Sequence, residues 1–334
     1  MRSKSGRRRL ILPVLRILVP IAVLALTFRA IDADAALSAL RRADWRWIAA
    51  GLLLMQVQIL LSAERWRFTA GRLGQALPRP LAYREYYLTT LVNQVVPGGM
   101  AGDAVRAARN RIRDADGRAR WGVAVRAIVL ERAAGQIAFF AVTGAGLLAW
   151  PILVGRRAPE ESTDLLLGGA GTIAAIVGLV ALAAILGPSR VRSFLKSFGP
   201  DMRRVYLERG AWAIQGVMSV ALVFSYVGIF AFAALAVGAP VPWVALVTVM
   251  PLALLTMLIP VSIGGWGLRE AAAAALWPMV GLASSAGVAS AILYGLVSLA
   301  GALPGLLVLV APGGRAKAGS SQAPEGREAP SSAA

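Results

Sequence analysis

The 334-residue sequence contains neither cysteine nor histidine, and these two absences exclude several kinds of chemistry. Without cysteine there is no disulfide bond and no thiolate nucleophile, and without histidine there is no imidazole base and no common zinc site. Carboxylates, Arg, Lys, Tyr and Ser remain as groups for any reaction. We therefore expect a protein that is not an enzyme and that needs no metal or other cofactor.

Charge is absent from one long stretch, because residues 211–268 contain no Asp, Glu, Lys or Arg. The whole sequence is 57% hydrophobic, with a mean hydropathy of +0.66. A membrane-spanning helix needs about 20 apolar residues, so this stretch alone is long enough for more than two passes. Spanning β-strands would instead show alternating segments of about 10 residues. The fold class predicted is an all-α, polytopic membrane protein.

Acidic residues are scarce, since 17 Asp and Glu stand against 35 Lys and Arg, for a formal net charge of +18. Most of the basic residues fall in four segments: 1–9, 64–120, 188–210 and 313–334. Positively charged cytoplasmic loops explain this pattern without a nucleic-acid partner. We expect a protein of the inner (plasma) membrane, with both termini cytoplasmic and its basic loops against anionic lipid.

Long apolar runs predict about six full spans. They lie at about 10–28, 45–63, 122–154, 165–187, 211–237 and 284–311. We expect a basic N-terminal tail at 1–9 and a transmembrane domain over 10–312, with halves at about 10–187 and 188–312. The tail 313–334 is rich in Ala, Gly, Ser and Pro and is expected to be disordered.

Two apolar segments are interrupted by motifs of the same spacing. One contains Pro97, Gly102 and Arg106, and the other contains Pro260, Gly265 and Arg269. Proline removes a backbone donor, glycine permits a tight turn, and a cation follows in both cases. Interrupted helices at matching places in two halves are typical of transporters built as inverted repeats.

The first interrupted segment, 86–102, has basic sequence on both sides, so we expect a re-entrant hairpin that returns to the cytoplasmic face. The second, 243–282, follows three predicted spans later and would enter from the outside. Alternatively, 243–260 and 267–282 form a full spanning hairpin, and the charge pattern fits both interpretations. The first interpretation predicts two halves related as an inverted repeat.

Charges inside the apolar segments are candidate site residues. Glu131-Arg132 lies about 15 Å beyond Trp121 along a helix, near the middle of a core about 30 Å thick, where charges must pair or face water. Arg126 lies about 140° around the helix from Glu131, so partners such as Arg106 or Arg269-Glu270 are expected. The alternative is a structural ion pair that holds helices together.

Helix restarts after glycine favour anions, because their free N–H groups and dipoles point at the ligand. Asp103 is expected to be the N-cap after the first break, and the alternative is a simple kink with a snorkelling Arg106. Asn93 and Gln94 are able to satisfy freed backbone groups or a substrate. We interpret Glu64-Arg65-Trp66 as a snorkelling helix end, and the tyrosines Tyr83, Tyr86 and Tyr87 as an interfacial belt.

Together these motifs resemble the transmembrane region of lysylphosphatidylglycerol synthases, which also occurs as stand-alone, flippase-like proteins. The resemblance covers roughly residues 10–311 and implies a substrate site built from both breaks and the charged pair between them. The residues expected there are Asn93, Pro97, Gly98, Gly102, Asp103, Arg106, Glu131, Arg132, Pro260, Gly264, Gly265, Gly267, Arg269 and Glu270.

The resemblance also implies a function in the handling of membrane lipids. A flippase-like domain would translocate or handle lipids with anionic or sugar-bearing headgroups, such as anionic phospholipids or isoprenoid-linked lipids. The aminoacyltransferase domain of the synthases is not found in this sequence, so synthase activity is not expected. The alternative is a non-transporting partner of a separate lipid-modifying transferase or glycosyltransferase.

The predicted topology can be tested with single cysteines, because the protein has none of its own. Cysteines at Ala76 and Ala115 flank the interrupted segment 86–102, and we expect both to react with an impermeant maleimide from the cytoplasmic side. Reaction of the two positions from opposite sides of the membrane would contradict the re-entrant interpretation.

Overall fold

The computed structural model describes residues 22, 25–30, 32–96, 99–110, 112–113, 119–154, 193, 196–258 and 263–310. Several predicted features therefore lie wholly or mainly outside the described residues. They are the tails 1–9 and 313–334, the spans 10–28 and 165–187, and the break residues Pro97, Gly98 and Pro260.

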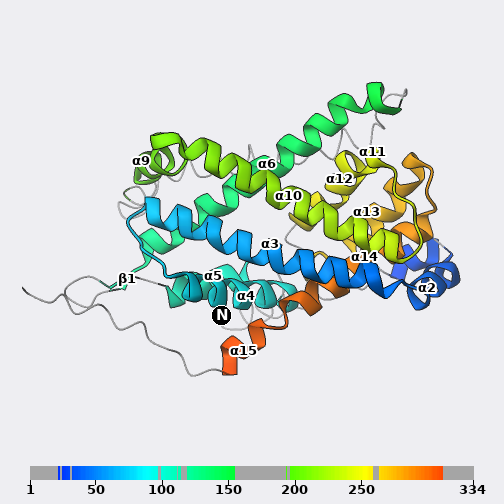
Figure 1. Ribbon diagram of the computed structural model, residues 1–334, viewed down its shortest axis with the longest axis horizontal. Coiled ribbons are helices and arrows are strands. Elements are labelled where there is room, and N and C mark those ends of the chain that lie inside the picture. The colour runs from blue at the N-terminus through cyan, green and yellow to red at the C-terminus, as the bar shows by residue number, and fades with distance from the viewer. Residues whose placement is uncertain are drawn as a thin grey trace, which may run out of the picture.

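Four helices of the described chain are long and apolar enough to cross a membrane. The elements are α3 (Trp45–Arg72), α6 (Trp121–Val154), α10 (Ala211–Ala236) and α14 (Ser284–Ala302). They correspond to four of the predicted spans and run along the length of the bundle (Figure 1). The helical membrane-protein class is thereby confirmed, while the total number of spans stays a prediction.

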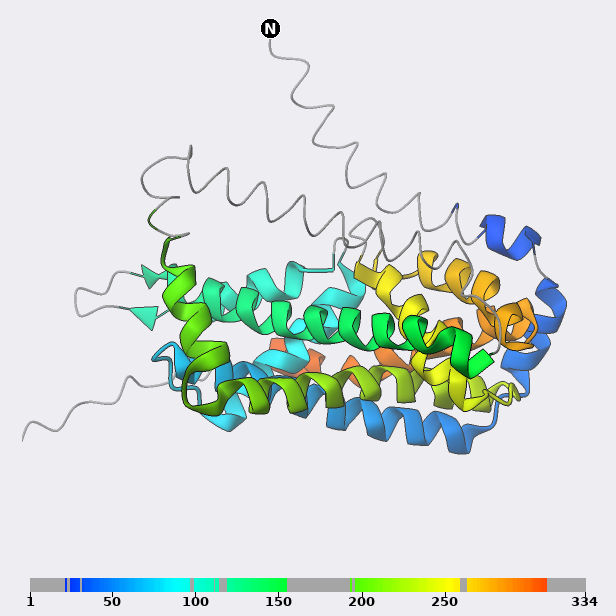
Figure 2. The same ribbon diagram turned by 90° about the horizontal axis from the view of Figure 1, so that it is seen from above.

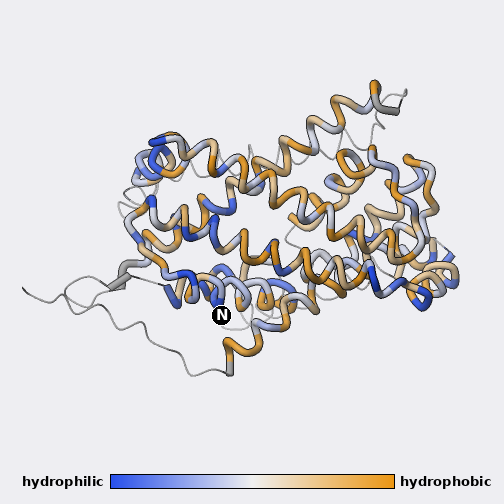
Figure 3. The backbone as a smooth tube through the Cα atoms, in the orientation of Figure 1, coloured by the Kyte–Doolittle hydropathy of each residue, from blue (hydrophilic) through white to orange (hydrophobic). Residues whose placement is uncertain are grey.

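Short elements lie at the two ends of the bundle. One end carries α9 (Phe198–Met202), η1 (Arg203–Leu207), η2 (Glu208–Gly210) and the two-residue strands β1 (Ile112–Arg113) and β2 (Ala119–Arg120). The other end carries α2 (Ala33–Arg41) and α11 (Trp243–Val247), and α15 (Gly305–Val310) follows α14 after Pro304. Hydrophilic residues gather at the ends around α9 and α2 (Figure 3). The antiparallel β1–β2 pair is a small departure from the expected all-α fold.

The first interrupted segment forms a helical hairpin of α4 (Arg79–Val95) and α5 (Ala101–Arg109). The two helices approach so closely that a Cβ atom added at Gly102 would overlap the carbonyl oxygen of Thr89. The chain then returns to its starting point, where Gln75 Nε2 donates to Asn110 O at 2.7 Å. This geometry confirms that the segment enters and returns at the same end of the bundle.

An ion pair closes the base of this hairpin. Arg109 donates to both carboxylate oxygens of Glu85 at 2.9–3.0 Å, and these hydrogen bonds raise the pKa of the guanidinium. The base of the hairpin therefore carries a charged clasp between its two helices.

The second interrupted segment places α12 (Val249–Leu255) and η3 (Thr256–Leu258) beside α13 (Leu268–Leu276), which continues into η4 (Trp277–Val280). The connecting turn is rich in glycine, with φ angles of 55° at Gly264, 82° at Gly265 and 88° at Gly267. Side chains other than hydrogen are strained in this left-handed region. Because α13 and η4 together extend only about 20 Å, the structure favours the re-entrant interpretation over a full spanning hairpin.

The two hairpins enter the bundle from opposite ends and meet in its interior. The α4–α5 hairpin lies toward the end that carries β1, and α13 lies toward the opposite end in both views (Figures 1 and 2). Their tips touch, since a Cβ added at Gly264 would lie 2.6 Å from Gln94 Oε1. This meeting of the breaks agrees with the sequence, while a two-fold relation between the halves stays a prediction.

Close packing of α6 against α11 gives a test of this arrangement. A Cβ at Gly146 would overlap the carbonyl oxygen of Val247, whereas nothing lies within 4 Å of a Cβ at Gly144 on the same helix. We expect Gly146→Ala to lower the free energy of unfolding by about 1–3 kcal/mol, because the backbone must shift. Thermal unfolding in detergent micelles measures this loss. Gly144→Ala is the control, and equal stability of the two variants would contradict the packing.

Candidate functional site

Five charged side chains from α3, α5 and α6 meet inside the bundle, and we call them the charge network. They are Arg65, Asp103, Arg106, Glu131 and Arg132. At its centre, Glu131 accepts from Arg65 Nη2 at 2.6 Å and from Arg106 Nη2 at 3.1 Å. The network thus joins two spanning helices to the first hairpin.

Asp103 links the hairpin to the rest of the network. Its carboxylate accepts from Arg106 Nη2 at 2.7 Å, from Arg132 Nη2, and from Asn93 Nδ2 at 3.3 Å. The predicted N-cap role of Asp103 is wrong: α5 begins at Ala101, and the arginines hold this carboxylate. Asn93 instead satisfies the freed backbone, because its Oδ1 accepts from Gly102 N at 2.8 Å.

Aromatic rings complete the burial of Arg106, which is 0% exposed. Its guanidinium carbon lies 4.7 Å from the ring centroids of both Trp66 and Tyr86. Tyr86 also donates to Glu131 at 3.3 Å. The expected interfacial role is therefore wrong for Tyr86, whose ring stabilises a buried cation instead.

Arg269 and Glu270 form a separate, fully buried pair at the second hairpin. Arg269 Nη2 donates to Glu270 Oε1 at 2.5 Å, and Glu270 Oε2 accepts from the backbone N–H of Gly267 at 2.6 Å. The Arg269 guanidinium carbon also lies 5.2 Å from the Trp266 ring and 4.9 Å from the Tyr294 ring. The expectation that Arg269-Glu270 pairs with Glu131 is wrong, because Arg269 and Glu270 pair with each other, whereas Glu131 pairs with Arg65 and Arg106.

Arg65, rather than Arg269, is the partner of Glu131. The interpretation of Arg65 as a snorkelling residue is therefore wrong. Arg65 is 6% exposed, and α3 continues past it to Arg72. One sequence signal could have found it. Gln58, Ser62, Arg65 and Thr69 recur at intervals of three and four residues, which places a polar stripe on one face of α3.

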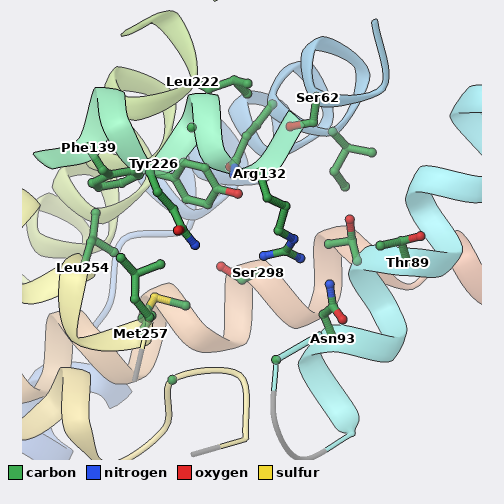
Figure 4. A pocket seen from close by; sticks show the side chains of 18 of the residues that line it. Ser62, Thr89, Asn93, Arg132, Phe139, Leu222, Tyr226, Leu254, Met257 and Ser298 are labelled. Carbon is green, nitrogen blue, oxygen red and sulfur yellow. The ribbon is translucent and has the colours of Figure 1, made fainter. Parts of the chain in front are cut away.

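A cavity of about 280 Å³ lies where the network and the two hairpin tips meet. Its walls include Gln94 and Gly99 of the first hairpin and Gly264 and Gly265 of the second. Arg132 points into it from α6, between Ser298 of α14 and the α4 residues Thr89 and Asn93 (Figure 4). Apolar side chains of Phe139, Leu222, Leu254 and Met257 surround another part, so the cavity has polar and apolar regions.

The predicted site residues thus fall into three groups. Those that line the cavity are Asn93, Glu131, Arg132, Gly264 and Gly265. Those that support the lining residues or the hairpin tips are Gly102, Asp103, Arg106, Gly267, Arg269 and Glu270. Pro97, Gly98 and Pro260 lie outside the described residues. Contact of any of these residues with a substrate stays a prediction.

The family model of the lysylphosphatidylglycerol synthase TM region matches residues 13–305, which include both hairpins and the whole charge network. The chain belongs to this family. Its membership agrees with a multi-pass membrane protein whose context is lipid metabolism. No relative among curated proteins matches the chain. Within the described residues of this family member, no group of three or more acidic side chains suits a metal ion, and the lack of a cofactor stays a prediction.

Removal of the central carboxylate tests the structural role of the network. Glu131→Gln leaves Arg65 and Arg106 without their shared anion, so we expect the free energy of unfolding to fall by about 3–5 kcal/mol. Equilibrium unfolding in detergent micelles provides the measurement. Glu208→Gln is the control, because the Glu208 side chain is 44% exposed and lies 3.8 Å from Arg203. A loss no larger than that of the control would mean that the network does not hold the helices together.

Proposed function

We propose that the protein translocates lipids with anionic or sugar-bearing headgroups across the inner membrane. In this mechanism the headgroup enters the central cavity while the acyl chains stay in the bilayer. The observation that carries the proposal is the position of the cavity, which is bounded by the tips of two hairpins from opposite ends of the bundle. Movement of either tip would open the cavity toward one end only, as alternating access requires.

Arg132 is the group that we expect to hold the headgroup. Its side chain is 32% exposed, whereas the Arg106 side chain is 0% exposed and the Arg65 side chain 7% exposed. Its described hydrogen bond is to Asp103 through one guanidinium nitrogen, and the guanidinium extends into the cavity (Figure 4). Arginine binds phosphate oxygens with two parallel hydrogen bonds, so this position suits an anionic headgroup.

We further propose that the protein has no catalytic activity of its own, that it needs no cofactor, and that both termini face the cytoplasm. The basic segment around α9 would then lie at the cytoplasmic end of the bundle, together with the α4–α5 hairpin. This orientation opens the first hairpin toward the cytoplasm and the second toward the outside.

Lipid movement by the purified protein in liposomes tests the proposal. The probe is an anionic phospholipid with a dithionite-sensitive fluorophore on its acyl chain. We expect added dithionite to bleach the fluorophore in both leaflets of proteoliposomes, but only the fluorophore in the outer leaflet of empty liposomes. Arg132→Gln should slow the movement at least about tenfold, which corresponds to the loss of one charge-assisted contact of about 1.4 kcal/mol or more. Arg203→Gln is the control, because that side chain is 76% exposed on η1.

Two outcomes would count against translocation. If Arg132→Gln folds normally and moves lipid at the rate of the unaltered protein, the cavity is not the path. If the unaltered protein moves no labelled lipid, the alternative gains support, namely a non-transporting partner of a separate lipid-modifying transferase or glycosyltransferase.

A further inference from the structure

The charge network contains one more positive charge than negative charge. Three guanidinium groups, Arg65, Arg106 and Arg132, share two carboxylates, Asp103 and Glu131. Two other arginines have carboxylates of their own, in the fully buried pair Arg269–Glu270 and the partly buried pair Arg126–Asp201. By sequence, the apolar stretches 10–21, 165–187 and 259–262 contain no Asp or Glu.

The most exposed cation of the charge network, Arg132, lies at the cavity. Four of the five network side chains are at most 7% exposed, whereas the side chain of Arg132, which lines the cavity, is 32% exposed. An uncompensated charge inside a membrane protein is costly unless an anion or water meets it. One monovalent anion beside Arg132 would bring the net charge of the site to zero.

Two side-chain amide oxygens without hydrogen-bond partners are a second, independent indication that the cavity binds a polar ligand. Gln58 is 3% exposed and lines the cavity from α3, and its Oε1 has no hydrogen-bond partner among the described residues. Gln94, at the tip of α4, also lines the cavity, and its Oε1 has no hydrogen-bond partner among the described residues. A buried amide without a partner is costly. A hydroxyl both donates and accepts, so it satisfies a carboxamide in either orientation.

We infer that the cavity selects a headgroup with a single negative charge, namely a phosphodiester that carries a hydroxyl-bearing group such as glycerol or a sugar. This inference rests on the proposed lipid-handling function and narrows its substrate. A zwitterionic headgroup brings no net charge, and a phosphomonoester brings about −1.5 to −2 at pH 7. A headgroup esterified with a cationic amino acid would add to the surplus. The cavity of about 280 Å³ is close to the lower limit of roughly 300 Å³ for ligand pockets, which suits a compact headgroup.

Binding of lipids with identical acyl chains to the purified protein tests the selectivity, with native mass spectrometry as the readout. The probes are phosphatidylglycerol, phosphatidylmethanol, phosphatidic acid, phosphatidylcholine and lysylphosphatidylglycerol. We expect phosphatidylglycerol to bind at least about tenfold more tightly than each of the others, because each lacks the charge match or the hydroxyls. Equal or tighter binding of any of the other four probes would overturn the inference.

Two variants separate the charge from the hydroxyl contribution. Arg132→Gln should bring phosphatidylmethanol and phosphatidylcholine, which both lack headgroup hydroxyls, to within about twofold of each other, and Arg132→Lys should keep the preference for phosphatidylmethanol, since it retains the charge. Gln58→Leu should abolish the preference for phosphatidylglycerol over phosphatidylmethanol and leave the preference over phosphatidylcholine. Gln56→Leu on the same helix is the control, because Gln56 bonds Gly301 and Tyr87 instead. Unchanged selectivity in both Arg132→Gln and Gln58→Leu would place the selective site elsewhere.

Soluble competitors distinguish a lipid headgroup site from a site for free anions. Glycerophosphoglycerol, the deacylated headgroup, should displace phosphatidylglycerol at millimolar concentration, whereas inorganic phosphate at the same concentration should not. Equal displacement by inorganic phosphate would overturn the inference. Selective binding without lipid movement would support the inference and contradict translocation, while movement of all five lipids at equal rates without selective binding would do the reverse.

Discussion

The ion pairs of the buried Glu131 carboxylate with Arg65 and Arg106 set how α3, α5 and α6 pack against one another. A charge at this depth is costly when alone, so α6 is stable only where cations from α3 and α5 reach it. The three elements must therefore pack together in one register. This requirement draws the tip of the first hairpin into the bundle and keeps it there.

Glycine allows the hairpins to meet this requirement. Gly102 lets α5 lie directly on α4, which brings Arg106 and Asp103 to the level of Glu131. Gly264 does the same for the second tip, which rests against Gln94. The space left between the tips and the network is the cavity, so its polar wall follows from the way the charges are paired.

The two hairpins differ in how they handle their arginine. Arg269 forms a neutral pair with the adjacent Glu270 and is closed off by aromatic rings. The first hairpin instead shares its charges with α3 and α6 and leaves the guanidinium of Arg132 accessible. The arginines at matching places in the two motifs thus have different partners: Arg269 pairs with its neighbour Glu270, whereas Arg106 belongs to a network that includes the cavity-lining Arg132. For this reason we assign the proposed headgroup contact to Arg132 and not to Arg269.

The lengths of the apolar runs and the local Pro and Gly residues were enough to predict the membrane class, four of the helices and two interrupted segments, and they left open whether the second segment is re-entrant. The sequence also showed that Glu131 needs a partner, since desolvation is costly wherever the helix packs. The identity of that partner, which is Arg65, 66 residues away, rather than Arg269, is visible only in the packed helices. Which arginine reaches Glu131 depends on the rotation and register of the packed helices. The polar stripe on α3 marks one face of that helix, but it does not say which neighbouring helix packs against that face.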